Sequence, residues 1–185
     1  MKSLLIIFTS LSLIYQYTLP TKYEKKINKE IEKIWDTSIE KEQITISENR
    51  SFNEEASLFK LKSKDSLIGF LYFNKVNACK KGGCDSNEES LFTDKYDHFY
   101  YLVLFDPNLL ILKVKIIDYQ SDYGYEITGS GWLKQFNKKS ADMLHYGKEI
   151  DAISGATVSA NSLLIDIQRI YTYLKEIHQH TFIKK

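Results

Sequence analysis

The chain has 185 residues, 43% of them apolar and 14% aromatic, which is enough for one domain with a substantial core. Its 25 basic and 24 acidic residues nearly cancel, and this argues against a nucleic-acid-binding protein, which needs a basic face to neutralise phosphates. The many aromatic residues exclude a disordered chain, and two cysteines are too few for a four-thiolate zinc or iron–sulfur site.

The first 20 residues have the character of a signal peptide or an N-terminal membrane anchor. Lys2 precedes a mostly apolar run over residues 4–15, which is shorter than the roughly 20 residues that span a bilayer. No small-residue cleavage site is clear. We therefore expect export to the periplasm or to the outer face of the cytoplasmic membrane, with cleavage and anchoring by residues 4–15 as open alternatives. A buried N-terminal strand or helix is the third alternative.

The elements that follow are a helix, a short strand and a hairpin. Ile27, Ile31 and Ile34 recur at helical spacing among lysines and glutamates, which predicts an amphipathic helix. Apolar runs on both sides of a polar turn predict an antiparallel hairpin. The expected ranges are 23–36 for the helix, 43–47 for the short strand, and 58–62 and 67–76 for the hairpin.

Two cysteines flank a Gly-Gly turn after this hairpin. Cys79 and Cys84 are close enough in sequence to form a disulfide in an oxidising compartment, where it would staple the loop. A redox-active dithiol is the alternative, although four intervening residues do not match the Cys-x-x-Cys spacing.

A second hairpin, a glycine-punctuated loop and a long helix complete the chain. Asp106, Pro107 and Asn108 form the expected hairpin turn, because proline fixes a favourable φ there. We expect strands over residues 98–105 and 109–119, a loop over 121–131, one helical turn over 132–136 and a helix over 158–179. The predicted fold is α+β, an antiparallel sheet of hairpins packed against a long C-terminal helix.

Residues 151–157, with the sequence Asp-Ala-Ile-Ser-Gly-Ala-Thr, lead directly into the last predicted helix. Small residues leave space above the backbone, and Thr157 lies where the first helical N–H groups lack partners. Free N–H donors and the helix dipole favour an anion, in particular a phosphate, at this position. An ordinary helix cap made by Ser154 or Thr157 is the alternative.

This segment resembles the flavinylation motif Asp-x-x-Ser-Gly-Ala-Thr of the FMN-binding domain family. That family includes covalently flavinylated subunits of the sodium-pumping NADH:quinone reductase and of the Rnf electron-transport complex. The resemblance extends over residues 98–174, because the order of hairpin, Tyr-Gly loop, Trp/Phe turn and motif is also shared. One departure is the loop over residues 121–126, where the respiratory subunits have a Glu-Thr-Pro-Gly-like run.

The resemblance implies that FMN is attached covalently, through its phosphate, to Thr157. A separate flavin transferase, using FAD and magnesium, would make the bond outside the cytoplasm. Asp151 is then expected to orient the threonine or to be read by the transferase, with a cap or dipole role as the alternative. The remaining expected cofactor-binding residues are Ser154, Gly155 and Ala156 in the motif and Tyr123, Gly124, Tyr125 and Trp132 around the flavin ring.

The expected protein is an electron carrier in a membrane-associated redox chain rather than an enzyme on its own. Its expected partners are the flavin transferase and membrane-bound redox proteins, with no nucleic acid, no metal and no catalytic residues. The rival is a non-redox extracytoplasmic binding module whose helix N-terminus holds a phosphate or a carboxylate. Residues 1–20 are expected as the signal or anchor, 21–57 as a helix and connector, and 58–185 as the FMN-binding domain.

Overall fold

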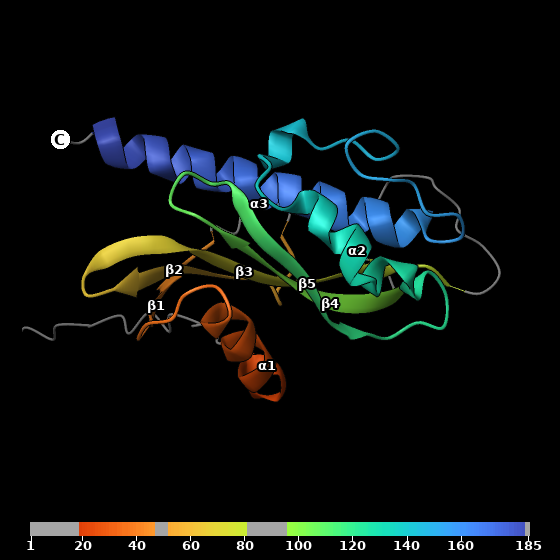
Figure 1. The fold of residues 1–185 in the computed structure, drawn as a ribbon, viewed down its shortest axis with the longest axis horizontal. Helices are drawn as coiled ribbons and strands as arrows, with labels where there is room; N and C mark the ends of the chain where they lie inside the picture. Colours follow the sequence, from red (N-terminus) through yellow and green to blue (C-terminus); the bar gives the residue numbers. More distant parts are fainter. Residues whose placement is uncertain (1–18, 47–51, 81–95, 184–185) are drawn as a thin grey trace, which may run out of the picture.

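Five antiparallel strands form one sheet in chain order, β1-β2-β3-β4-β5 (Figure 1). The structure is a computed structural model that describes residues 19–46, 52–80 and 96–183. The strands are β1 Glu40–Ile44, β2 Ser57–Ser63, β3 Ser66–Ala78, β4 Asp97–Phe105 and β5 Ile111–Tyr119. The helices are α1 Thr21–Glu32, α2 Ser130–Leu133 and α3 Thr157–Ile183, with short 3-10 turns η1 Tyr125–Thr128, η2 Lys134–Phe136 and η3 Ala141–Met143. The expected α+β fold is confirmed.

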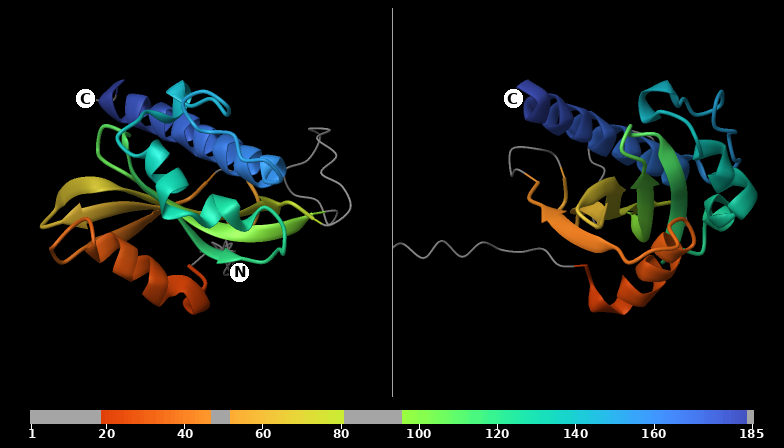
Figure 2. Two further views of the ribbon diagram at one scale, coloured as in Figure 1. Left: turned by 45° about the vertical axis from the view of Figure 1, so that its right-hand side comes forward. Right: turned by 60° about the vertical axis from the view of Figure 1, so that its left-hand side comes forward.

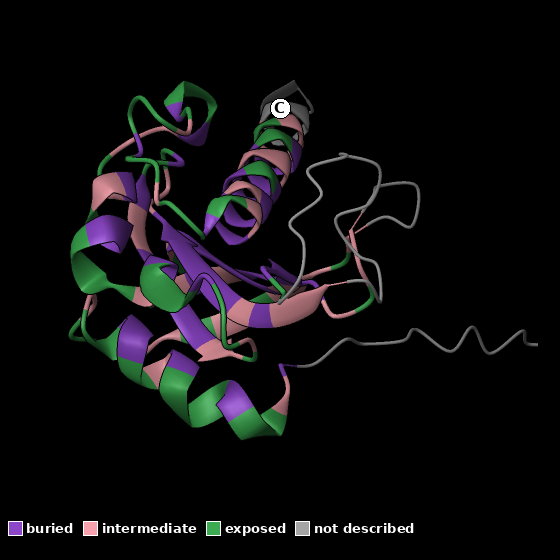
Figure 3. Cartoon of the chain, turned by 90° about the vertical axis from the view of Figure 1, so that its right-hand side faces the viewer, coloured by how far each residue is buried: buried purple, intermediate pink, exposed green. Residues whose placement is uncertain are grey.

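Helices cover both faces of the sheet, with α3 across one face and α1 against the other (Figures 1 and 2). Along β4, Tyr101 and Val103 point into the core beneath α3, whereas Leu102 and Leu104 point into the core beneath α1. Successive side chains alternate between the faces of a strand, so a strand buried on both faces is apolar throughout. Along α1, buried and exposed residues alternate around the helix (Figure 3).

The two predicted hairpins are confirmed, together with their turns. Ser63 pairs with Ser66, and both central residues have positive φ, 48° at Lys64 and 66° at Asp65. Two positive φ angles are typical of the type I′ turn, whose twist matches that of the strands. In the second hairpin, Asp106 Oδ1 accepts hydrogen bonds from two backbone N–H groups of the turn.

The first helix and the first strand differ from the predicted ranges. α1 ends at Glu32, four residues before the expected end, although Ile34 still packs against the core beneath α1. β1 lies at 40–44 instead of 43–47, because its pairing with β2 places Ile44 opposite Leu58. A short edge strand with weak alternation takes its bounds from its neighbour rather than from its own pattern. Both elements lie within the expected helix and connector of residues 21–57. β1 is a strand of the sheet, and α1 packs against one face of it.

The expected signal or anchor covers residues 1–20, of which residues 1–18 lie outside the described residues. Among the helices of the described ranges, none combines the length and the hydrophobicity needed to cross a bilayer.

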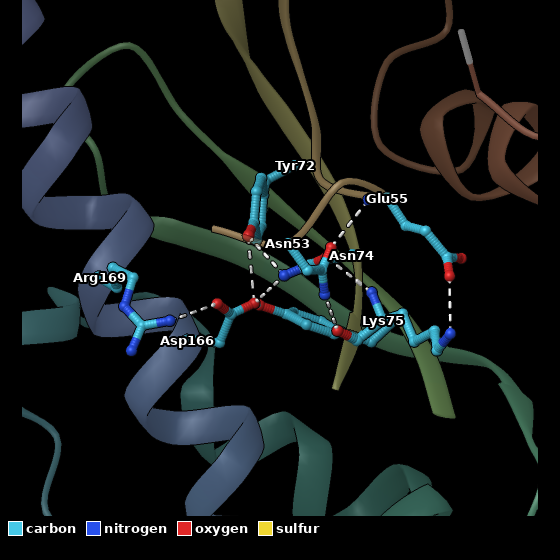
Figure 4. A network of polar contacts seen from close by, with 8 residues as sticks. Asn53, Glu55, Tyr72, Asn74, Lys75, Asp166 and Arg169 are labelled. Atoms are coloured by element: carbon cyan, nitrogen blue, oxygen red, sulfur yellow. Dashed lines mark hydrogen bonds and ion pairs between the residues drawn. The ribbon is translucent and has the colours of Figure 1, made fainter. Parts of the chain in front are cut away.

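A buried polar network joins α3 to the sheet (Figure 4). Asp166 is fully buried, and its Oδ2 accepts hydrogen bonds from Asn74 Nδ2 at 2.7 Å, Tyr101 Oη at 2.8 Å and Tyr72 Oη at 3.2 Å. Oδ1 lies 3.7 Å from a guanidinium nitrogen of Arg169 and has no hydrogen-bond partner among the described residues. Burial raises the pKa of Asp166, against the opposing effect of the hydrogen bonds from Asn74 and Tyr101. The network fixes where α3 lies along β3 and β4.

A second buried acid, Glu30, joins α1 to β5. Its two carboxylate oxygens lie 2.5 Å from the ammonium groups of Lys33 and Lys113. Burial acts to raise its pKa, but the hydrogen bonds from Lys113 and Lys33 outweigh burial, and the pKa lies below the ordinary 4.5. The contact therefore stabilises the fold above about pH 4.5 and loses this effect as the pH falls through the folded-state pKa.

We expect Glu30→Gln to lower the free energy of unfolding by about 1 kcal/mol at neutral pH, because the two lysines lose their anionic partner. The difference between variant and wild type should be smaller at an acidic pH below the folded-state pKa, where Glu30 is protonated in both states, than at neutral pH. Urea unfolding at the two pH values measures it. A difference that does not change with pH would contradict the assignment of this stabilisation to the ionised carboxylate.

Candidate functional site

The motif ends on the first residue of α3, with the Thr157 side chain exposed. The carbonyl of Ala156 accepts the first helical hydrogen bond, from the N–H of Ala160 at 2.9 Å, so Ala156 is the N-cap residue. Alanine has no side-chain oxygen with which to cap the helix. In the described ranges we find no acceptor for the N–H groups of Thr157 and Val158. The helix thus begins with unbonded donors beside an exposed hydroxyl, which suits an anionic group.

A tight turn precedes the helix. The N–H of Ala156 donates to the carbonyl of Ile153 at 3.2 Å, and Gly155 has a φ of +80°. This left-handed conformation favours glycine. A Cβ at position 155 would meet nothing within 4 Å, so the space above the turn is open. Ser154 and Gly155 are exposed, as the approach of a ligand to this turn requires, whereas Ala156 is buried.

The start of the motif is held by α2 and η2. Trp132 Nε1 donates to the carbonyl of Asp151 at 2.8 Å. Gln135 bonds the same residue twice, donating to its carboxylate at 2.9 Å and accepting from its N–H at 2.8 Å. The ring of Trp132 is buried and packs edge-on against Phe136. The structure thus places Trp132 and Asp151 as partners that anchor the motif loop.

Tyr146 fixes the middle of the motif. Its hydroxyl accepts from the N–H of Ile153 at 2.8 Å and donates to the carbonyl of the same residue at 3.2 Å. The motif is therefore clamped at Asp151 and at Ile153, while the residues between Ile153 and the helix remain exposed except for Ala156. Clamping on one side and exposure on the other leave Thr157 accessible on a rigid support.

The loop containing Tyr123, Gly124 and Tyr125 lies beside the first turn of α3. A Cβ on Gly124 would come within 3.0 Å of Ser159 Oγ and of Tyr119 Oη, and its φ is +73°. Only glycine fits this position, for both reasons. Tyr123 is 40% exposed and Tyr125 60% exposed. Two accessible aromatic side chains on a loop tied to the first turn of α3 suit a planar aromatic ligand.

A chain of hydrogen bonds ties this loop to the helix. Tyr119 Oη donates to the carbonyl of Tyr123 at 2.6 Å and lies 2.8 Å from Ser159 Oγ. Since the single proton of Tyr119 is used by that carbonyl, Ser159 is the donor in the second bond. Ser159 Oγ also accepts from the N–H of Cys79 at 2.8 Å. Burial raises the pKa of Tyr119, so it remains a neutral donor.

The predicted disulfide can be placed only in part. Cys79 is buried at the end of β3, next to Ser159, and has no disulfide partner within the described residues. Cys84 lies outside the described residues, so its pairing with Cys79 stays a prediction.

Sequence reasoning missed four residues that build the site: Tyr119, Gln135, Tyr146 and Ser159. All four act through contacts between segments that are distant in sequence or through backbone groups, which leave no local pattern. Ser159 offered the best clue, because it lies two residues beyond Thr157 on the same first turn of the helix.

The comparison with family models matches residues 96–171 to the FMN-binding domain. The matched segment begins just before β4 and contains the Tyr-Gly-Tyr loop, α2, the motif and the first half of α3. No curated protein matches the chain. The match covers every segment that contributes to the geometry above except the end of β3. Residues 96–171 are thus similar to the FMN-binding domain family.

Proposed function

We propose that the protein is an extracytoplasmic electron carrier in which FMN is bonded through its phosphate to the hydroxyl of Thr157. The observation that carries the proposal is the exposed Thr157 hydroxyl at the first position of α3, beside backbone donors without acceptors in the described ranges. The match to the seven-residue motif supports the same position. Bound FMN supplies transfer of one or two electrons.

The residues of the motif have separate roles in this proposal. Thr157 Oγ1 forms a bond to the phosphorus of the FMN half of FAD while the bond between that phosphorus and AMP breaks. AMP leaves, and the hydroxyl proton is released. A separate transferase with magnesium performs this step. The N–H groups of the first turn then hold the phosphate, and Gly155 keeps the approach open.

The ring would lie beside the loop of residues 123–125. Tyr123 and Tyr125 offer accessible aromatic faces, and Tyr119 and Ser159 fix that loop to the helix bearing Thr157. Trp132 and Gln135 hold the motif at Asp151, so the attachment point and the aromatic loop keep a fixed relation to one another. Electron transfer is favoured by such a rigid support, because little reorganisation accompanies each transfer.

The extracytoplasmic part of the proposal rests on the sequence of residues 2–15, a lysine followed by an apolar run. Covalent attachment fits that location, since a dissociated cofactor would be lost outside the cytoplasm. Protease added to spheroplasts should digest the domain; its full protection there would contradict export.

Co-expression with a flavin transferase tests the covalent bond. We expect denatured, desalted protein to remain yellow and fluorescent, and its intact mass to increase by one FMN less one water. Protein made without the transferase is the control and should lack both signals. Colour that disappears on denaturation would show FMN held without a covalent bond and would overturn the proposed linkage.

A further inference from the structure

A basic groove follows the outer edge of β5, between α1 and α2. Its volume is about 380 Å³. Four lysines line it, Lys33 from α1's C-terminal end, Lys113 and Lys115 from β5, and Lys134 from the start of η2. Apolar side chains, among them Leu112 and Leu133, line the rest. The groove thus combines an apolar surface with positive charges from three elements.

The charges of the groove do not balance. Glu30 is the carboxylate among the lining residues, and it pairs with Lys33 and Lys113. We find no acidic partner for Lys115 or Lys134 in the described part of the chain. The groove therefore carries an excess of three positive charges, whereas the whole chain carries only +1. Such a local excess attracts an anionic partner.

Within the described residues, both ends of the outer edge of β5 have hydrogen-bond partners. At one end, Ile111 exchanges backbone hydrogen bonds with Lys138 and Lys139. At the other end, Lys26 Nζ donates to the carbonyl of Ile117 at 3.3 Å. The middle of the strand, residues 112–115, lines the groove. Lysines on an edge strand often have the single role of preventing unwanted strand pairing. That role does not require an apolar recess framed by two further elements, which is present here.

We propose that this groove binds an acidic, extended segment of a partner protein. An extended segment can pair with the open middle of β5 while its carboxylates reach Lys115 and Lys134. The spread of the cations over three elements favours a chain of several negative charges over a single small anion. Electrostatic attraction of this kind speeds encounter and selects partners.

The position of the groove relates it to the flavin site. Leu133 and Lys134 line the groove, while their neighbours Trp132 and Gln135 hold the motif at Asp151. One further step rests on the proposed function: the acidic partner is then the electron donor or acceptor of the bound flavin. Binding at the groove does not itself require the flavin.

The test measures binding of a fluorescently labelled oligoglutamate peptide to the flavin-free full chain by anisotropy. We expect Lys115→Glu/Lys134→Glu to weaken binding by about tenfold or more, and added salt to weaken binding to the wild type. The control is Lys64→Glu/Lys148→Glu, which makes the same change in net charge at two exposed lysines outside the groove. This control should bind within about twofold of the wild type.

Two results would overturn the proposal. Equal weakening by both double variants would show general charge attraction without a groove. No binding to the wild type would leave the lysines as protection of the strand edge. Because the protein carries no flavin in this measurement, failure of the flavin attachment has no effect on either result.

Discussion

Replacing Thr157 with alanine is expected to reduce FMN attachment to background in cells that contain a flavin transferase. The phosphoester needs a hydroxyl oxygen, and alanine has none. Thr157 is exposed at the first helical position, so its removal leaves packing intact and should change stability by no more than about 0.5 kcal/mol. Intact mass and in-gel flavin fluorescence of purified protein measure the loss, and circular dichroism confirms that the variant is folded.

Three further variants separate the hydroxyl of Thr157 from its neighbours. Thr172→Ala removes an exposed threonine from the same helix and should leave attachment unchanged. Ser154→Ala tests the other exposed hydroxyl in the motif and should also retain attachment. Thr157→Ser keeps a hydroxyl at the same place and should retain at least part of it. Full attachment in Thr157→Ala would place the bond on a different residue.

The strands and the last helix could be predicted from sequence because their burial leaves a regular pattern. β3 and β4 are buried on both faces and read as apolar runs between polar turns. α3 has an apolar stripe that includes Leu163, Ile167 and Ile170. β1 was less predictable, since a short edge strand leaves only a weak alternation and takes its bounds from β2.

The position of the candidate motif directly before α3 was also predictable, because seven consecutive residues carry it. The contacts that hold it were not. The indole N–H of Trp132 is bonded to the backbone of Asp151 and its ring is buried, a contact that the sequence did not indicate. Its expected place beside the flavin ring stays a prediction. A tryptophan that follows two glycines gives no indication of whether it faces a ligand or a backbone carbonyl. The same holds for Tyr119 and Ser159, whose contact joins a strand to a helix 40 residues away.

The position of Asp166 in the sequence already indicates a buried polar contact, which helix propensity alone does not predict. It lies three residues after Leu163 and four before Ile170, on the buried side of an otherwise apolar stripe. Charged residues are rarely buried unless they are paired. The clue therefore predicts polar partners on the facing sheet, but it does not identify them as Tyr72, Asn74 and Tyr101.

Replacing Asp166 with alanine is expected to lower the free energy of unfolding by about 3 to 5 kcal/mol, because three buried donors lose their acceptor and each unsatisfied donor costs about 1 to 3 kcal/mol. The variant leaves Tyr72, Asn74 and Tyr101 with donors aimed at an empty space in the core. The matched control is Asp142→Ala, which removes an exposed carboxylate bonded to Lys175 and should change stability by no more than about 0.5 kcal/mol. Urea unfolding near neutral pH measures both.

The cost of Asp166→Ala should come from the stranded donors rather than from the lost carboxylate. If so, Tyr72→Phe and Tyr101→Phe, each worth about 1 kcal/mol alone, become less costly when combined with Asp166→Leu, because only the amide of Asn74 is then left without an acceptor. The triple variant should recover part of the stability lost by Asp166→Ala. Equal losses in the single and triple variants would instead assign the effect to the charge and to its contact with Arg169.

Hydrogen exchange can show whether this network holds α3 alone or the whole fold. Asp166 joins α3 to both β3 and β4 by buried hydrogen bonds. The sheet keeps a separate core beneath α1 on its other face. We expect Asp166→Ala to speed exchange in α3 more than in the central strands, since the helix loses its polar anchor first. Thr157 lies on that helix, so attachment of FMN to Asp166→Ala should become slower at temperatures where α3 exchanges but the sheet does not. Uniform loss of protection across helix and sheet would show that the network is needed by the whole core.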